Sequence, residues 1–506
     1  MKLRLASNAL ANLLGALVPS LVALGTVPLV VRELGDASYG VYSLVTAIVG
    51  YFAVIDINVT AGSVKFIAGF SARKEYTKIG ETVFFGIMVY ALIGVVGALG
   101  LYAGAHFFVT EVFSVPAALA VEATATLQLA ALGFFLGQLQ NYLQSVPQAL
   151  MRYDVSSRLE MLFGIAVPLL TVLVLIAGHG LFEVVLVRVA SSALHCLVLW
   201  RAIRRLLPVL ALCWPGRSTR RGLLGFSAWS VLSRFASLSY AHADKLIIGA
   251  LAGVTALTYF TIAATLANRV LGLTYRLSSV LFPAASALAA NGELARLDRL
   301  YLKATRYVVF FNAAMLVLVA VFAHQILLYW MNAQFARQGA LVLAVMAGSQ
   351  FVDSLTSLPS LVNDGMGHPR VSGLFALVRA CAGVLMVWLG VACWGIDGAA
   401  WGHLAASLLL STAFIVYVHG RTVPTDLRRL LLRGYAPTLY SVLGVALFAA
   451  LAEHLFARTA FDFVFLLAVT VALLFMVGML FVIDKDDRLV AWTRVKACLG
   501  QLAWRS

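Results

Sequence analysis

The sequence is built from apolar stretches of about twenty residues, the length that an α-helix needs to cross the hydrocarbon core of a bilayer. Uninterrupted stretches of this kind predict membrane helices, because the strands of a membrane barrel are shorter and alternate apolar with polar residues. Of the 506 residues, 62% are hydrophobic and only 12% are charged, which excludes an ordinary soluble domain. We therefore expect an all-α polytopic membrane protein.

We expect about fourteen membrane spans, counted as apolar stretches of spanning length. In two places, at residues 178–180 and 395–398, only a short glycine-containing turn separates one expected span from the next. The expected limits of the spans are residues 10–31, 40–61, 81–108, 119–146, 159–177, 180–200, 223–250, 256–281, 306–330, 339–362, 371–394, 397–419, 434–456 and 461–483.

The distribution of basic residues predicts how the chain is oriented. Most of the 37 Lys and Arg residues fall in alternate connections, which places them on one side of the membrane, whereas the connections on the other side hold Arg32, Arg337 and Arg458. Cytoplasmic loops are enriched in Lys and Arg, so the N- and C-termini are expected in the cytoplasm. This pattern accounts for the net charge of +15 without a nucleic-acid partner.

Short internal matches indicate a duplication. Leu29-Val30-Val31 matches Leu246-Ile247-Ile248, and Ser145-Val146-Pro147 matches Ser357-Leu358-Pro359 at a similar separation. Each half has an even number of spans, so the halves share one topology and are related by an axis along the membrane normal. The expected domains are a six-helix bundle at 1–200, a cytoplasmic linker at 201–222, a second six-helix bundle at 223–420, two additional spans at 421–483 and a cytoplasmic amphipathic tail at 484–506.

The predicted helical hairpin over residues 223–281 carries four cations. On a helix, the spacing of Arg234 to Lys245 and of Arg269 to Arg276 places each pair on one face. A charge at the bilayer centre costs about 2.5–3.5 kcal/mol even on a lenient scale, so these faces should meet water or a bound anion. Lys245 and Arg276 lie near helix ends, where snorkelling to lipid headgroups is an equal alternative. We expect one wall of a wet, cationic cavity here.

Other charged residues within the spans are further candidates. Arg379 has no local partner and joins the cationic cavity. The acids Asp56, Asp244, Asp353 and Glu160 are expected to be buried, either as sites for a coupling ion or as partners of a buried cation. The scattered cysteines and histidines predict no metal site, and the absence of a phosphate-binding GxxxxGK[ST] motif predicts no built-in ATPase. We expect no cofactor.

Several short motifs carry a family resemblance. They are Leu34-Gly35 before Tyr39-Gly40-Val41-Tyr42, Asp56 before Lys65-Phe66-Ile67-Ala68, Asp244-Lys245-Leu246-Ile247-Ile248-Gly249 before Tyr259, and Leu281-Phe282-Pro283. With these motifs the chain resembles the polysaccharide-export and O-antigen flippases, in the superfamily of the multidrug and toxin extrusion transporters and the lipid II flippase. Asn58 departs from the pattern, because members commonly show Gly there.

The resemblance implies two six-helix bundles that alternate access to a central cavity in the bacterial inner membrane. It implies a transporter, not an enzyme, that moves a polyprenyl-diphosphate-linked oligosaccharide for surface polysaccharide synthesis. The expected partners are this glycan, membrane lipids, a coupling ion (proton or sodium) and the polysaccharide polymerase or export machinery. One alternative is an ion-coupled multidrug antiporter, although its mostly cationic substrates favour acidic cavities. Another is an integral-membrane glycosyltransferase or polymerase, for which the chain lacks a large outside loop.

Overall fold

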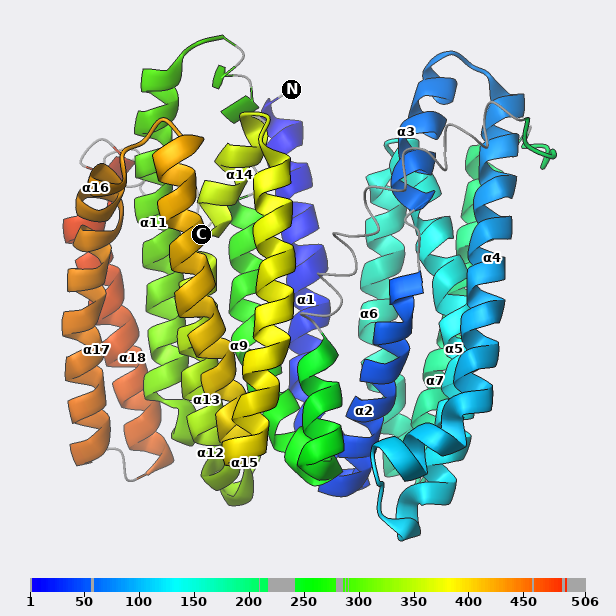
Figure 1. Cartoon of the computed structure of the whole chain (residues 1–506), viewed down its shortest axis with the longest axis horizontal. Coiled ribbons are helices and arrows are strands. Elements are labelled where there is room, and N and C mark those ends of the chain that lie inside the picture. The colour runs from blue at the N-terminus through cyan, green and yellow to red at the C-terminus, as the bar shows by residue number, and fades with distance from the viewer. Residues whose placement is uncertain are drawn as a thin grey trace, which may run out of the picture. The chain divides into compact units, whose positions relative to one another are not determined.

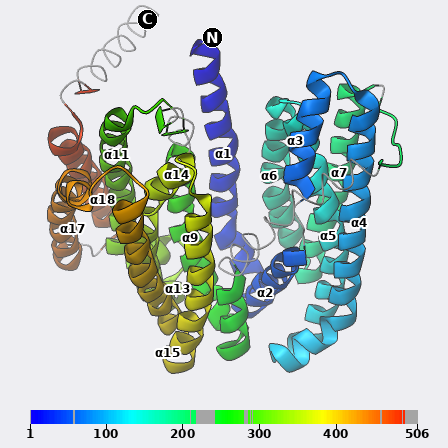
Figure 2. The same ribbon diagram turned by 45° about the horizontal axis from the view of Figure 1, so that its top comes forward.

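A computed structural model of the chain places its described residues in helices joined by turns, and these residues contain no strand (Figures 1 and 2). The described residues are 2–55, 59–208, 210–216, 242–278, 285–286, 288–289, 291–456, 459–484 and 487–488. The chain divides into two compact units, Met1–Thr258 and Tyr259–Ser506. The finer domain boundaries expected from the sequence, at residues 200, 222 and 420, stay predictions.

The first unit is a bundle of long helices. Helix α1 packs against α6, and α4, α5 and α7 form a second packed group. The helices are α1 (Lys2–Leu34), α2 (Asp36–Phe52), α3 (Val59–Ala72), α4 (Tyr76–Phe107), α5 (Ala117–Ala149), α6 (Tyr153–Ile176) and α7 (Leu181–Leu206), and α9 (Gly253–Ser278) begins in this unit.

The second unit is also a helical bundle, in which α13 packs against α11, α12 and α15, and α17 packs against α11 and α18. Its further helices are α11 (Leu294–Val321), α12 (Ala323–Trp330), α13 (Ala333–Ser354), α14 (Ser357–Gly365), α15 (Pro369–Arg421), α16 (Leu427–Arg429), α17 (Ala436–Phe456) and α18 (Ala460–Val477). Short π-helical turns precede α17 and follow α18, at Leu430–Tyr435 and Gly478–Val482.

Among the described residues, 9 helices are long and apolar enough to cross a membrane. This confirms the all-α membrane class, whereas the total of about fourteen spans stays a prediction. Both predicted glycine turns are confirmed. Helix α6 ends at Ile176 and α7 begins at Leu181, and α15 is interrupted at Trp394 and Gly395.

Helix α15 is a hairpin of two arms, which Figure 1 shows in yellow and orange-yellow. Gly395 has a φ of +59°, in the left-handed region that glycine enters without steric cost. The arms are in close contact at Gly390 and Gly398. A Cβ atom on Gly390 would lie only 2.0 Å from the carbonyl oxygen of Gly398. Small residues permit such close helix contacts in membranes, and here they bring the two arms together.

Two predicted spans are divided in the structure. The span expected at 40–61 contains the end of α2 at Phe52 and the start of a separate helix, α3, at Val59. The span expected at 339–362 lies within one candidate membrane span, Ala333–Gly365, which consists of two helices, α13 and α14. Between them the Ser354 and Thr356 hydroxyls donate to the carbonyl oxygens of Phe351 and Asp353. Such local side-chain bonds compete with regular helix geometry, so the chain turns at this point.

The span expected at 306–330 also differs. Helix α11 begins earlier, at Leu294, and α12 follows it from Ala323. Leu297 and Tyr301 are fully buried in the core of the second unit, and the Tyr301 hydroxyl lies 2.9 Å from Nε2 of His419. The earlier start follows from this packing, which continues the apolar face of α11 beyond the predicted limit.

Candidate functional site

The second unit contains an ion pair within its membrane-spanning helices. Arg379, on the first arm of α15, pairs with Asp353, near the end of α13. The side chain of Arg379 is 18% exposed and that of Asp353 is 5% exposed. Removing two charges from water is costly, so such a pair persists only where further hydrogen bonds satisfy its remaining donors and acceptors.

Serine hydroxyls on the second arm of α15 supply these bonds. Arg379 donates to the Ser411 and Ser407 hydroxyls, each at 3.3 Å, and Ser411 donates to Oδ1 of Asp353 at 3.3 Å. Ser407 also bonds to Ser349 on α13, at 2.9 Å. The pair is therefore held by α13 and by both arms of the hairpin that Gly395 makes possible.

A polar cavity of about 140 Å³ lies beside Arg379. Its polar lining consists of Arg379 and four hydroxyls, and aromatic and aliphatic side chains complete the wall. The lining residues are Thr356, Ser360, Ser372, Phe375, Ala376, Arg379, Leu410, Ser411 and Phe414. A guanidinium surrounded by hydroxyls offers charge-assisted hydrogen bonds to an anion such as a phosphate group.

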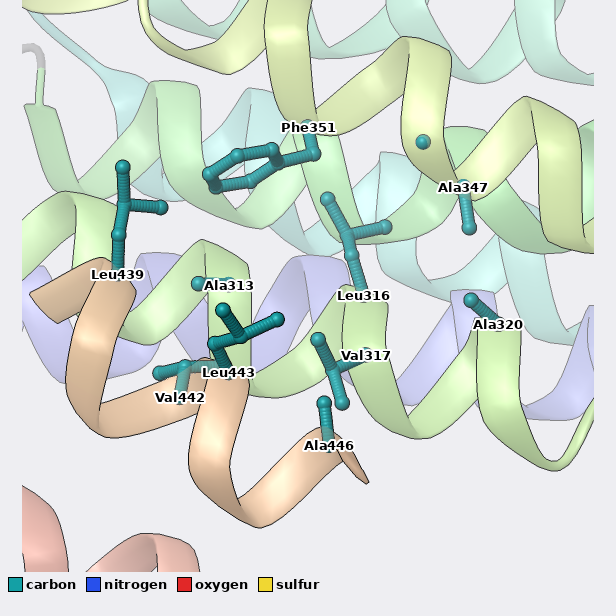
Figure 3. A pocket seen from close by; sticks show the side chains of 11 residues that line it. Ala313, Leu316, Val317, Ala320, Ala347, Phe351, Leu439, Val442, Leu443 and Ala446 are labelled. Atoms are coloured by element: carbon teal, nitrogen blue, oxygen red, sulfur yellow. The ribbon is translucent and has the colours of Figure 1, made fainter. Parts of the chain in front are cut away.

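A second cavity, of about 190 Å³, lies between α11, α13 and α17 and has a different character (Figure 3). Its lining side chains are aliphatic or aromatic, including Leu316, Val317 and Phe351, and none carries a polar atom. This cavity offers nothing to an anion and suits a hydrocarbon chain.

The lining of the polar cavity does not include Lys245 or Arg269, two of the predicted cations whose side chains the structure describes. Lys245 is half-buried in the first unit, and its backbone N–H donates to the carboxylate of buried Asp244 at 2.7 Å. Arg269 lies on an exposed face of α9 in the second unit. Arg276 lies in the last turn of α9, with its backbone alone described. Arg234 and Asp56 lie outside the described residues.

Glu160 requires a correction, because the sequence predicted a buried acid and the structure places this residue on an exposed face of α6. The physical reason is that α6 buries little of its surface, namely Ser156, Thr171 and Leu175. The Glu160 carboxylate therefore does not need a buried partner.

Sequence reasoning identified Arg379 and Asp353 but missed the serines that hold them. A signal was present, since Ser407 and Ser411 lie four residues apart in an apolar stretch and so share one helix face. Ser349 and Asp353 have the same spacing on α13. Matching polar faces on two apolar helices indicate a polar contact between them.

The described residues define an all-α polytopic membrane protein with a polar, charged site among its membrane-spanning helices. Residues 29–338 match a model of the family described as polysaccharide biosynthesis protein. This match extends over more than half of the chain, so the protein belongs to that family. The family resemblance seen in the sequence is thereby confirmed.

Individual relatives agree with this assignment. The chain is 23% identical over 356 residues to the uncharacterized membrane protein EpsK of Bacillus subtilis (strain 168), covering 70% of each chain. It is 34% identical over 61 residues to a putative O-antigen transporter of Shigella flexneri, which is 12% of this chain and 15% of that protein.

Solved structures share the fold. An inward-facing multidrug resistance MATE family transporter of the MOP superfamily superposes with a TM-score of 0.70 at 14% identity, covering 82% of this chain and 98% of that one. The lipid II flippase MurJ, in an inward closed conformation, gives 0.69 at 10% identity, covering 92% and 99%. These similarities are structural, and they show that the chain shares the fold of these two proteins.

Proposed function

We propose that this protein is a flippase that moves a polyprenyl-diphosphate-linked oligosaccharide across the bacterial inner membrane, with both termini in the cytoplasm. Its membership of the polysaccharide biosynthesis family supports a surface glycan as the cargo. The observation that carries the proposal is the hydroxyl-lined cavity beside Arg379, which sets an anion-binding group among membrane-spanning helices.

The diphosphate group is the part of this substrate whose transfer into the hydrocarbon core of the bilayer costs the most free energy. In a low-dielectric interior an unpaired anion is strongly disfavoured, so a carrier must supply cations and hydrogen-bond donors along its path. The planar guanidinium of Arg379 matches two phosphate oxygens at once. Arg234, Lys245, Arg269 and Arg276 are proposed as further cations that the headgroup meets.

The polyprenyl tail has the opposite requirement. It needs continuous apolar surroundings, because each exposed methylene costs about 0.8 kcal/mol in water. The cavity between α11, α13 and α17 provides such surroundings in the same unit as Arg379 (Figure 3). We propose that a segment of the tail lies there while the glycan headgroup crosses.

Energy for transport is proposed to come from an ion gradient, with proton or sodium as the coupling ion. Asp56, Asp244 and Asp353 are the proposed acids for this role or for charge pairing. The polymerase or export machinery that uses the flipped glycan is the proposed protein partner.

A multidrug antiporter is the second candidate, favoured by the structural similarity to a MATE transporter. A site for cationic drugs needs an acidic wall. In the polar cavity described here the lining is a guanidinium and hydroxyls, whereas Asp353 is paired with Arg379 and does not line the cavity. This charge arrangement favours the flippase.

The decisive experiment deletes the gene in its host and measures surface glycan and lipid-linked oligosaccharide. We expect loss of the glycan and accumulation of the lipid-linked precursor on the cytoplasmic leaflet, both restored by the wild-type gene. The variant Arg379→Gln should restore at least tenfold less export, and Arg337→Gln, which alters an exposed arginine on α13, should restore it fully. Normal glycan in the deletion strain, with new sensitivity to cationic drugs, would support the antiporter instead.

A further inference from the structure

We propose that Asp353 is an internal counter-ion that occupies Arg379 in the empty carrier, and that the diphosphate of the lipid-linked substrate replaces it from the polar cavity. The proposal rests on the flippase function and adds a mechanism for substrate capture. It treats the Arg379–Asp353 pair as an exchangeable contact and not as a fixed structural bridge.

The positions of the two side chains set the order of events. Arg379 lines the polar cavity and is partly exposed, whereas Asp353 lies deeper, at 5% exposure, and does not line the cavity. An anion that enters the cavity therefore meets the guanidinium, whereas the Asp353 carboxylate is not part of the cavity wall. A guanidinium carries five N–H donors, so it can begin to bind a phosphate before it leaves Asp353.

The hydroxyl groups that line the cavity allow the exchange to proceed while the charged groups keep hydrogen-bond partners. Ser411 lines the cavity and now donates to Asp353 at 3.3 Å. This bond keeps a donor on Asp353 while the guanidinium turns to the phosphate, and the other hydroxyls of the cavity lining can donate to the phosphate oxygens. Ser360 and Ser372 line the cavity as well, and at present they bond to each other at 3.3 Å, while Ser372 donates to Asp364 at 2.6 Å.

Competition by Asp353 explains how one site can both capture and release an anion. Without Asp353, the largely buried guanidinium of the empty carrier would lose the carboxylate that balances its charge, which is unfavourable within the membrane. With it, the substrate must displace a carboxylate, so its affinity is reduced to a level that permits release. Removing the carboxylate charge should therefore tighten binding of the diphosphate, whereas a purely structural bridge predicts unchanged or weaker binding.

The test measures binding of farnesyl diphosphate, a short prenyl diphosphate, to the purified full-length protein in nanodiscs by isothermal titration calorimetry. We expect Asp353→Asn to lower the Kd about tenfold. Arg379→Gln and the double variant Asp353→Asn/Arg379→Gln should raise it at least tenfold. Ala376→Trp, which fills the polar cavity, should also raise it, and Arg337→Gln should leave it unchanged. An unchanged or higher Kd in a folded Asp353→Asn protein would overturn the proposal.

Competitors identify which source of phosphate the site takes. Inorganic diphosphate should compete with the prenyl diphosphate, because the cavity recognises the headgroup. Phosphatidylglycerol added to the nanodisc should compete at least tenfold less well. Failure of inorganic diphosphate to compete, or equal competition by phosphatidylglycerol, would overturn the assignment to a diphosphate.

Two controls distinguish a failure of the exchange proposal from loss of folding and from failure of the proposed function. The double variant replaces both charges by neutral amides and leaves neither charge without its partner, so its thermal unfolding should remain cooperative even if a single variant is unstable. Glycan export is scored in parallel. If export requires this protein but Asp353→Asn does not tighten binding, the exchange proposal fails alone. If the binding pattern holds but the deletion strain exports normally, the proposed function fails and the anion site stands.

Discussion

The Thr258 hydroxyl donates a 2.7 Å hydrogen bond to the backbone carbonyl oxygen of Asp36. This bond joins the start of α9 to the start of α2. A second contact accompanies it, because a Cβ atom on Gly40 would lie 1.9 Å from the carbonyl oxygen of Val254. These segments follow the matched triplets Leu29-Val30-Val31 and Leu246-Ile247-Ile248 of the predicted duplication, and within the first unit they are in direct contact.

The first prediction concerns this contact. Gly40→Val should force the first turns of α2 and α9 apart, because the added atoms meet backbone and not a mobile side chain. We expect a loss of stability of about 1–3 kcal/mol, as in other overpacked sites. The measurement is thermal unfolding of the purified protein. Gly137→Ala on α5, where a Cβ atom meets nothing within 4 Å, is the matched control and should unfold at or above the wild-type temperature. Equal melting of both variants would contradict the contact.

The glycine turns show what the sequence could predict about the fold. Gly178 and Gly395 interrupt apolar runs, and glycine is the residue that reverses the chain at no steric cost. The break after Ser354 could not be predicted in this way, because it depends on hydroxyls that bond to the backbone of the preceding turn. The choice between helix and turn there is made by local geometry that periodicity does not reveal.

The sequence was sufficient to predict which charged residues belong to the site, but not which residues they contact. Arg379 and Asp353 stand out because ionisable residues within apolar spans are costly. Their pairing depends on how α13 packs against α15, which no local pattern specifies. Glu160 shows the related difficulty that a membrane helix is apolar on its lipid face as well as on its buried face. Hydropathy therefore could not show which side of α6 this carboxylate occupies.

The second prediction concerns the segment after α18. Asp487 lies 2.6 Å from Nζ of Lys303 and accepts a 2.6 Å hydrogen bond from the Tyr307 hydroxyl. These partners hold the pKa of the Asp487 carboxyl below its usual value. A lowered pKa in the folded state stabilises the contact at pH values above the unfolded pKa of about 4, and the stabilisation is lost as the pH falls through the folded value.

The measurement compares thermal unfolding of wild type and Asp487→Asn at pH 7 and at pH 3. Because the Asp487 side chain is 38% exposed, we expect the variant to be destabilised by less than about 1 kcal/mol at pH 7. The difference should shrink at pH 3, because the wild-type carboxyl loses charge as the pH falls towards its lowered pKa. A difference of the same size at both pH values would show that the charge is not responsible.

The third prediction tests the orientation of the chain. In a cysteine-free background, Arg337→Cys and Ala460→Cys should react with a membrane-impermeant maleimide in intact cells. Both positions are exposed, and both lie in connections with few Lys and Arg residues, which are predicted to face the outside. Arg152→Cys and Glu293→Cys are also exposed and should react only after lysis. Labelling of Glu293→Cys from outside would overturn the predicted orientation and the number of spans before it.

The last prediction asks whether the contact between α2 and α9 opens during transport. Alternating access between duplicated bundles requires the outer ends of the helices to approach and separate, and Asp36 and Thr258 lie at such ends. If their hydrogen bond must break in each cycle, a covalent link beside it should arrest transport. Ala37→Cys and Val254→Cys, combined and treated with a short thiol cross-linker, should reduce glycan export at least tenfold, and cleavage of the linker should restore it. Each single cysteine variant, treated in the same way, should export normally. Efficient cross-linking with full export would mean that this contact stays closed throughout the cycle and that any alternating movement occurs elsewhere.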